Sequence, residues 1–387
     1  MKVKDLKLRE IFTTNAQKTI EVELETDKVK ARASAPIGTS RSRYEVVYLP
    51  IEDLKKEFPS IKRRFVSQSF AGMEEVDYFL KFIDKTSNFR KIGGNLALCL
   101  SSAFLKAFAL EQGKEVFEFL SKEKKSIPLP LCNVAGGWRR QSDIQEFLFL
   151  PVHQKSFLEN ISKIAHAYHQ LGIELREKDK NFNFGKNIES AWLTSLDLNK
   201  VLEILTEIAT ENELKIGLDV AASQLWDGKN YVYKSGENIA RAEQLDLMEQ
   251  LTRQYPIVYI EDPFSEDDFV SFATLTHRLQ NKLVVGDDLF STDLNKLRYG
   301  ISYKAASGII IKPSQVGTMT DTIKVMEEAK SNKIRTIVSH RSGETDDTLI
   351  CHLAVGMNSD YIKIGIAGER TAKINEIIRI EELVSRS

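Results

Sequence analysis

The sequence predicts an α/β protein in which a small N-terminal α+β unit precedes a closed α/β barrel. The first ~125 residues read as a hairpin followed by helices, and beyond Pro128 short apolar segments alternate with amphipathic stretches. Strand–helix alternation on this scale indicates a parallel sheet, and about eight strands in roughly 250 residues favour a closed barrel over an open sheet. We therefore predict an N-terminal domain over residues 1–126 and a barrel domain over residues 127–387.

Composition excludes several classes of protein. With 387 residues, 42% hydrophobic and 28% charged, the chain has ample material for a globular core. Lys plus Arg number 54 and Asp plus Glu 55, so the net charge of −1 gives no sign of nucleic-acid or membrane-surface binding. Cys99, Cys132 and Cys351 lie far apart and in no C-x-x-C pair, which fits a reducing, cytoplasmic location without disulfides or a zinc cluster. The N-terminus alternates charged and apolar residues, and the best apolar run, 103–110, is split by Lys106, so neither a signal peptide nor a membrane span is expected.

The N-terminal unit begins with a predicted hairpin. Residues 19–24 and 29–35 both alternate apolar and polar positions around a turn at 26–28. Residues 36–43 are loop-like, and helical spacing extends from about residue 61 to residue 124. The aromatic stripe on these helices is expected in the core, and it comprises Phe104, Phe108, Phe117 and Phe119.

Eight apolar segments are the predicted barrel strands, and helical pattern fills most of the gaps between them. They are 129–134, 147–150, 216–220, 257–260, 283–285, 308–311, 336–338 and 361–364.

Charged residues stand at the ends of six of these strands: Asp219, Glu261, Asp287, Lys312, His340 and Lys363. From Glu261 onward the gaps are 26, 25, 28 and 23 residues, each about one βα unit. Side chains at the carboxyl ends of barrel strands face the mouth, where barrel active sites are built. Three converging carboxylates would repel one another unless a divalent cation joins them, and oxygen ligands suit Mg²⁺. A lysine kept near other cations there would have a lowered pKa and could act as a base.

Each of these residues alone would be unremarkable. A single acid after a strand is usually a helix cap or a solvated loop residue, and a single lysine usually lies at the surface. The regular run of six is what predicts an active site. The remaining histidines share no ligand spacing with the acids and are expected to be structural; they are His153, His166, His169, His277 and His352.

Several long motifs resemble the enolase (phosphopyruvate hydratase) family, in the family's order and over nearly the whole chain. Residues 216–223, 255–264 and 285–289 of this chain resemble the family's metal-bearing segments. Residues 312–317 resemble the strand end that carries the family's base. Residues 339–345 (Ser-His-Arg-Ser-Gly-Glu-Thr) are nearly identical to the family signature. Further likenesses lie at 36–40, 145–152, 362–365 and 379–383.

The resemblance implies an enolase-type (β/α)8-like barrel with an N-terminal capping domain, a cytoplasmic homodimer and a glycolytic reaction. It implies that 2-phosphoglycerate is dehydrated to phosphoenolpyruvate with one Mg²⁺ bound by the protein and a second arriving with substrate. The implied metal ligands are Asp219, Glu261 and Asp287. The implied catalytic residues are Lys312 as base, Glu146 on the acid side and His340 near the leaving hydroxyl. The implied substrate-binding residues are Ser40, Gln145, Arg341, Ser342 and Lys363.

Departures from the family pattern cluster in the half of the site that expels hydroxide. Residues 183–190 resemble the family's Gly-Asp-Glu-Gly-Gly segment, which puts Asn187 where the general acid belongs and leaves Glu189 close by. Arg139 stands at the family's histidine, and residues 13–17 replace its Asp-Ser-Arg-Gly-Asn-Pro motif.

Three functions therefore stay open. The chain is a divergent enolase whose acid is Glu146 alone or with Glu189, or a paralogue using the same base and Mg²⁺ on another phosphorylated or phosphonylated carboxylate. The third is a non-catalytic ligand-binding protein, which ranks last because it gives no reason to keep Lys312 and the acidic strand ends together.

Overall fold

An antiparallel three-stranded sheet opens the chain, in the order β1-β2-β3. The computed structural model describes residues 1–39, 42–120, 123–137, 142–153 and 155–386. The strands are β1 (Val3–Phe12), β2 (Lys18–Thr26) and β3 (Lys30–Ser34). The predicted hairpin is confirmed as β2 and β3. The structure adds β1, in which the charged pairs Lys4-Asp5 and Arg9-Glu10 interrupt the apolar residues and only Val3 and Leu6 are buried.

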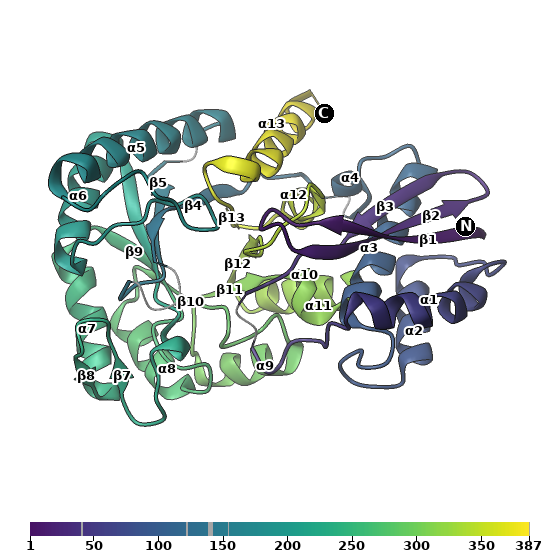
Figure 1. Cartoon of the computed structure of the whole chain (residues 1–387), viewed down its shortest axis with the longest axis horizontal. Helices are drawn as coiled ribbons and strands as arrows, with labels where there is room; N and C mark the ends of the chain where they lie inside the picture. The colour runs from purple at the N-terminus through teal and green to yellow at the C-terminus, as the bar shows by residue number, and fades with distance from the viewer. Residues whose placement is uncertain (40–41, 121–122, 138–141, 154, 387) are drawn as a thin grey trace.

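Four helices follow this sheet in the chain (Figure 1). They are α1 (Ile51–Phe65), α2 (Met73–Asp84), α3 (Gly94–Glu111) and α4 (Val116–Leu120). Helices α1 and α3 contact the sheet, whereas α2 and α4 pack against α3. Helix α3 is buried along most of its length and contacts both β2 and β3. Phe104, Phe108 and Phe117 are buried and Phe119 packs beside them, so the aromatic stripe is core, as expected.

Eight strands close into a barrel in the order β10-β11-β12-β13-β4-β5-β6-β9. Each of the eight predicted apolar segments coincides with one of them. The strands are β4 (Leu129–Gly136), β5 (Glu146–Pro151), β6 (Leu214–Asp219), β9 (Ile257–Glu261), β10 (Leu283–Gly286), β11 (Gly308–Ile311), β12 (Arg335–Ser339) and β13 (Tyr361–Lys363).

The prediction of a wholly parallel sheet is wrong at one strand. β5 runs antiparallel to both β4 and β6, whereas the other described barrel pairs are parallel. Residues 137–145 connect β4 directly to β5, and a parallel crossover needs a dozen or more residues, usually with a helix. Because β5 is reversed, its first residue, Glu146, lies at the mouth and pairs in register with Asp219.

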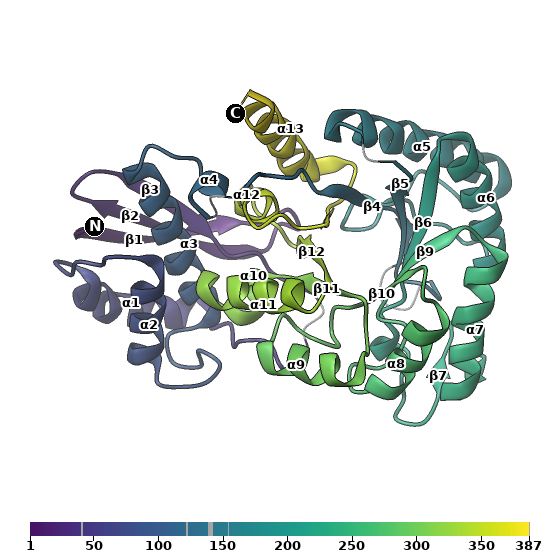
Figure 2. The same cartoon turned by 180° about the vertical axis from the view of Figure 1, so that it is seen from behind.

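Helices surround the barrel, as both views show (Figures 1 and 2). They are α5 (Phe157–Lys178), α6 (Leu198–Glu211), α7 (Arg241–Gln254), α8 (Phe269–Arg278), α9 (Leu294–Tyr303), α10 (Pro313–Val316), α11 (Met319–Ser331), α12 (Leu349–Gly356) and α13 (Thr371–Arg386). Two 3₁₀ turns, Ala222–Gln224 and Gly368–Arg370, and a small hairpin of β7 (Tyr231–Val232) and β8 (Asn238–Ile239) complete the fold. Among the described residues, no helix has the length and apolarity needed to cross a membrane.

The N-terminal unit is fixed to the barrel by hydrogen bonds that cap α11. The Ser101 hydroxyl accepts from the Met319 amide at 2.8 Å, and Asp77 accepts from the Thr320 amide at 2.9 Å. Lys106 also pairs with Asp347 at 2.8 Å across the same interface. One apolar cluster lies within residues 3–108 and another gathers residues 105–380. The barrel cluster includes Leu105, Ala109, Val116 and Phe117, so the two clusters do not fix the boundary, and the division between residues 126 and 127 stays a prediction.

Candidate active site

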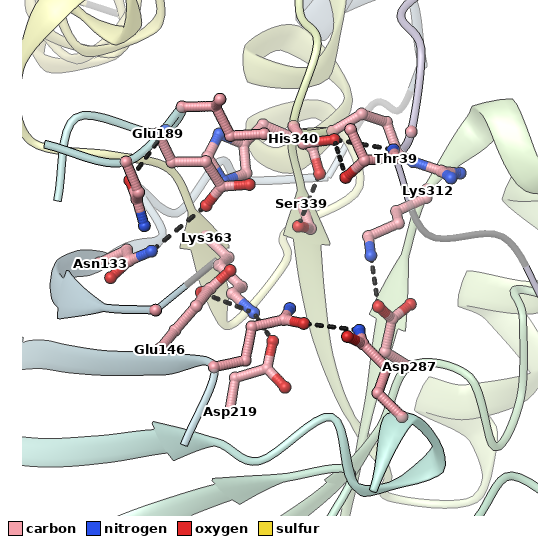
Figure 3. A pocket seen from close by; sticks show the side chains of 18 residues that line it. Thr39, Asn133, Glu146, Glu189, Asp219, Asp287, Lys312, Ser339, His340 and Lys363 are labelled. Atoms are coloured by element: carbon pink, nitrogen blue, oxygen red, sulfur yellow. Dashed lines mark hydrogen bonds and ion pairs between the residues drawn. The ribbon is translucent and has the colours of Figure 1, made fainter. Parts of the chain in front are cut away.

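A pocket of about 130 Å³ opens at the mouth of the barrel (Figure 3). Glu261 is fully buried and contacts it through Lys363, while Ser40 lies outside the described residues. The other predicted site residues all line it: Gln145, Glu146, Asp219, Asp287, Lys312, His340, Arg341, Ser342 and Lys363.

Lys363, at the end of β13, lies among three carboxylates. Its Nζ is 2.8 Å from Asp219 Oδ2, 2.8 Å from both Glu261 oxygens and 3.1 Å from Glu146 Oε2. Burial lowers the pKa of Lys363, but Asp219 and then Glu146 raise it, and the net pKa lies well above the ordinary value. The ammonium group is therefore charged and neutralises part of this acidic cluster.

Lys312 makes an ion pair with Asp287 on the other side of the pocket. Burial lowers the pKa of Lys312, and Arg341 and Lys363 lower it further, yet Asp287 raises it more. The expectation of a lowered pKa is therefore wrong for the ligand-free protein, because the neighbouring carboxylate outweighs the cations. Lys312 can accept a proton only when another cation neutralises Asp287.

The mouth holds more buried carboxylate than its lysines can neutralise. Burial, then Asp219, raises the pKa of Glu261 to about 8, and burial, then Asp287, raises that of Asp288 to about 7. Oxygens of Asp262, Asp287 and Asp288 also come within 4.8 Å of one another. A surplus of buried carboxylate oxygens fits a hard divalent cation.

Asp262 stabilises the backbone within that group. Its two oxygens accept the backbone amides of Asp287 at 2.9 Å and Asp288 at 2.7 Å, which fixes the turn after β10. Of the predicted ligands Asp219, Glu261 and Asp287, only Asp287 belongs to this close group, so the predicted ligand set stays a prediction.

A second acidic group, formed by Glu146 and Glu189, lies on the side of the pocket opposite Lys312 (Figure 3). Glu189 Oε2 accepts from Asn133 Nδ2 at 3.3 Å and lies 3.7 Å from His340 Nε2. Burial raises the pKa of Glu146 well above its ordinary range. Burial also raises the pKa of Glu189, but the positive charges of Arg370 and Lys363 oppose it, and the net pKa lies below the ordinary value. Such a split is typical of two carboxyl groups that share one proton.

His340 is buried beside this pair. Burial, then the charge of Arg370, lowers its pKa well below 6.5, so the ring is neutral at pH 7. A neutral imidazole can take part in a hydrogen bond without adding a charge to the pocket.

Polar groups suited to an anion form the remaining wall. The Arg341 guanidinium reaches the pocket, and the Ser342 hydroxyl accepts from the Thr39 amide at 2.9 Å. Gln145 Oε1 accepts from Gln224 Nε2 at 2.7 Å at the opposite rim. A guanidinium with hydroxyl and amide donors is the usual protein partner of a phosphate group.

Comparison with known proteins decides the family. The family model described as "Enolase, N-terminal domain" matches residues 3–120, and "Enolase, C-terminal TIM barrel domain" matches residues 124–387. The chain belongs to the enolase family. Proteins named Enolase from Pyrobaculum aerophilum and Archaeoglobus fulgidus are 37% and 38% identical to it, each over 100% of this chain and 98% of the relative. Enolase from Methanosphaera stadtmanae is 39% identical over 98% of this chain and 97% of the relative.

Membership of the enolase family makes the chain a carbon–oxygen lyase of the phosphopyruvate hydratase type. It also implies a small phosphorylated carboxylate as substrate and a divalent cation, which the acidic mouth of the barrel fits. No observation favours the alternative of a different substrate or of a non-catalytic paralogue.

The structure clarifies one comparison with the enolase pattern. Asn187 Oδ1 accepts the backbone amides of Glu189 at 2.9 Å and Ala191 at 3.0 Å, so this side chain builds the turn. Glu189 instead extends toward His340 and Glu146 (Figure 3). The sequence left open whether Glu189 could reach the acid side of the pocket, and in the structure its side chain lies there beside His340.

Sequence reasoning missed several residues of the site. Asn133, in the middle of β4, contacts Glu189, and Gln315 Nε2 donates to Asp287 Oδ1 at 3.3 Å. Glu45 contacts Arg341 from the N-terminal domain. None of these follows a barrel strand, so the spacing rule could not find them. Arg139, another departure from the family pattern, lies outside the described residues.

Proposed function

We propose that the chain dehydrates 2-phosphoglycerate to phosphoenolpyruvate, with Lys312 as the base and the Glu146–Glu189 pair as the acid. The observation that carries these roles is the placement of Lys312 and the two glutamates on opposite sides of one pocket (Figure 3). A base on one face of a substrate and an acid on the other suit removal of a proton and of a hydroxide from neighbouring carbons.

The metal-binding residues in this proposal are Asp219, Glu261 and Asp287, and the ion is Mg²⁺. When bound, Mg²⁺ supplies positive charge that stabilises the negative charge developing on the substrate carboxylate. Neutralisation of Asp287 leaves Lys312 without its ion-pair partner, so its amine can take the proton α to the carboxylate. Lys363, on the neighbouring wall, then serves the substrate carboxylate as a counter-ion.

Elimination completes the reaction. The electron pair left by the α-proton forms the new carbon–carbon double bond as the carbon–oxygen bond to the hydroxyl breaks. The proton shared by Glu146 and Glu189 passes to the departing hydroxide, which leaves as water. His340, neutral and next to Glu189, orients that hydroxyl. Arg341 and Ser342 hold the phosphate, and Gln145 completes the substrate wall.

The test adds 2-phosphoglycerate and Mg²⁺ and follows the ultraviolet absorbance of phosphoenolpyruvate. Wild-type protein should form product, and Lys312→Ala, which removes the proposed base, should not. Inactive wild-type protein that still binds Mg²⁺ would instead favour another phosphorylated or phosphonylated carboxylate. The homodimer and the cytoplasmic location stay predictions; sedimentation equilibrium would decide the first.

A further inference from the structure

Arg341 is held by a buried carboxylate that belongs to the other domain. Its Nη1 lies 2.9 Å from Glu45 Oε2 and its Nη2 3.2 Å from Glu45 Oε1, and both side chains are only 6% exposed. This is the fork-to-fork geometry in which a guanidinium binds any planar or tetrahedral anion. Glu45 therefore offers Arg341 the same two-point contact that a phosphate group offers.

The surroundings hold both groups in place. Ser314 Oγ lies 3.1 Å from Arg341 Nη1, and the Cβ of any residue larger than Gly38 would lie 1.8 Å from Nη2. On the carboxylate side, Glu45 Oε1 accepts from the Ser42 amide at 3.3 Å, and the amide of the next residue, Val46, donates to the Gln315 carbonyl at 3.0 Å. The pair is built into the wall of the pocket from both domains.

We propose that Glu45 is an internal anion that competes with the substrate phosphate for Arg341 and so sets how tightly the phosphate end is held. This inference rests on the proposed function, since Arg341 must be the phosphate ligand. A phosphate dianion that approaches Arg341 meets the Glu45 carboxylate and must displace it or accept its repulsion. Weaker phosphate binding also speeds release of a phosphorylated product.

The size of the effect follows from Coulomb's law. A unit charge a few ångströms from an anion, at an effective dielectric constant of about 20, changes a binding constant by at least about tenfold. Neutralising Glu45 should therefore tighten phosphate binding by about that factor or more. If Glu45 only positioned Arg341, its neutralisation would weaken phosphate binding, because the guanidinium would no longer be held in place.

The experiment measures inhibition of 2-phosphoglycerate dehydration by inorganic phosphate at constant ionic strength. Glu45→Gln keeps the size of the side chain and removes its charge, and its inhibition constant should fall at least about tenfold below that of wild type. The KM for 2-phosphoglycerate should fall with it. The matched control is Glu266→Gln: Glu266 accepts from Ser42 Oγ at 2.7 Å, so it contacts the same segment without touching Arg341. This control should leave the inhibition constant within about twofold of wild type.

An unchanged or higher inhibition constant in Glu45→Gln would overturn the proposal and leave Glu45 as a positioning residue. An equal fall in both variants would overturn it too, because the segment rather than the charge would then be responsible. If Glu45→Gln does not melt cooperatively, Glu45→Asp decides, since it withdraws the carboxylate by one methylene and should lower the constant severalfold. Active wild-type protein that phosphate fails to inhibit would contradict the assignment of Arg341, and with it the inference, while leaving the dehydration itself intact.

Discussion

The proposal that Glu146 and Glu189 share one proton can be tested by replacing each carboxylate with its isosteric amide. In Glu189→Gln the amide keeps the volume and can still contact Asn133, but it carries no acidic proton. We expect phosphoenolpyruvate formation to slow while exchange of the α-proton of 2-phosphoglycerate with solvent continues, because exchange requires only Lys312.

The expected size follows from the pairing. Loss of a general acid typically costs about 10²–10⁴-fold in rate, or about 3–5 kcal/mol of transition-state free energy. Each single variant leaves one buried carboxyl in the pocket, so Glu189→Gln and Glu146→Gln should lie near the lower end, about 10². The double variant removes both carboxyls and should approach 10⁴.

The assay compares two rates on the same sample. Proton NMR of substrate recovered from deuterium oxide measures exchange, and ultraviolet absorbance measures product. Asn187→Ala is the control: among the contacts described, its side chain bonds only backbone amides of the turn, and the variant keeps both carboxyls, so elimination should fall less than in Glu189→Gln while exchange continues. If Glu189→Gln eliminates at the wild-type rate, or if exchange and elimination fall equally, the shared-acid assignment is refuted.

Three further outcomes are expected. Lys312→Ala should abolish exchange and elimination alike, measured by the same two assays, and exchange that survives would exclude Lys312 as the base. Asp287→Asn should lower Mg²⁺ affinity in titration calorimetry, since an amide removes one ligand charge, and unchanged binding would contradict the proposed ligand set. Burial raises and Lys106 lowers the pKa of Asp347, with a net fall below 3.8, so this carboxylate stabilises the fold above that pH and the effect is lost as the pH falls through its folded pKa. Asp347→Asn should therefore flatten the loss of denaturant stability between about pH 5 and pH 3, and an unchanged slope would remove this pair from the account.

The barrel was predictable because its strands are buried on both faces and therefore appear as short continuous apolar runs. All eight could be located in this way. Two features could not. β1 does not alternate strictly because the charged pairs Lys4-Asp5 and Arg9-Glu10 interrupt its apolar residues, and the reversed direction of β5 depends on a connection that apolar patterning does not describe.

Some residues of the candidate site could likewise be predicted from the sequence, and others could not. Asp219, Glu261, Asp287, Lys312 and Lys363 follow strands at regular intervals, and the structure brings them together at the mouth. Glu189 belongs to an irregular turn whose next residue, Ser190, has a φ of 62°, so no periodicity fixes its register. Glu45 comes from the other domain, and only tertiary packing brings it to Arg341.

The pairing of β4 with β13 makes the order of synthesis matter for assembly of the barrel. β4 is its first strand and β13 its last, so the ring cannot close until almost the whole chain has left the ribosome. Long-range closure of this kind is slow. Lys363 arrives with that final strand, and until then the acids of β6 and β9 face one another without their buried counter-ion. A nascent chain should therefore depend on dissolved divalent ions to screen that repulsion, and refolding should be fastest when they are plentiful.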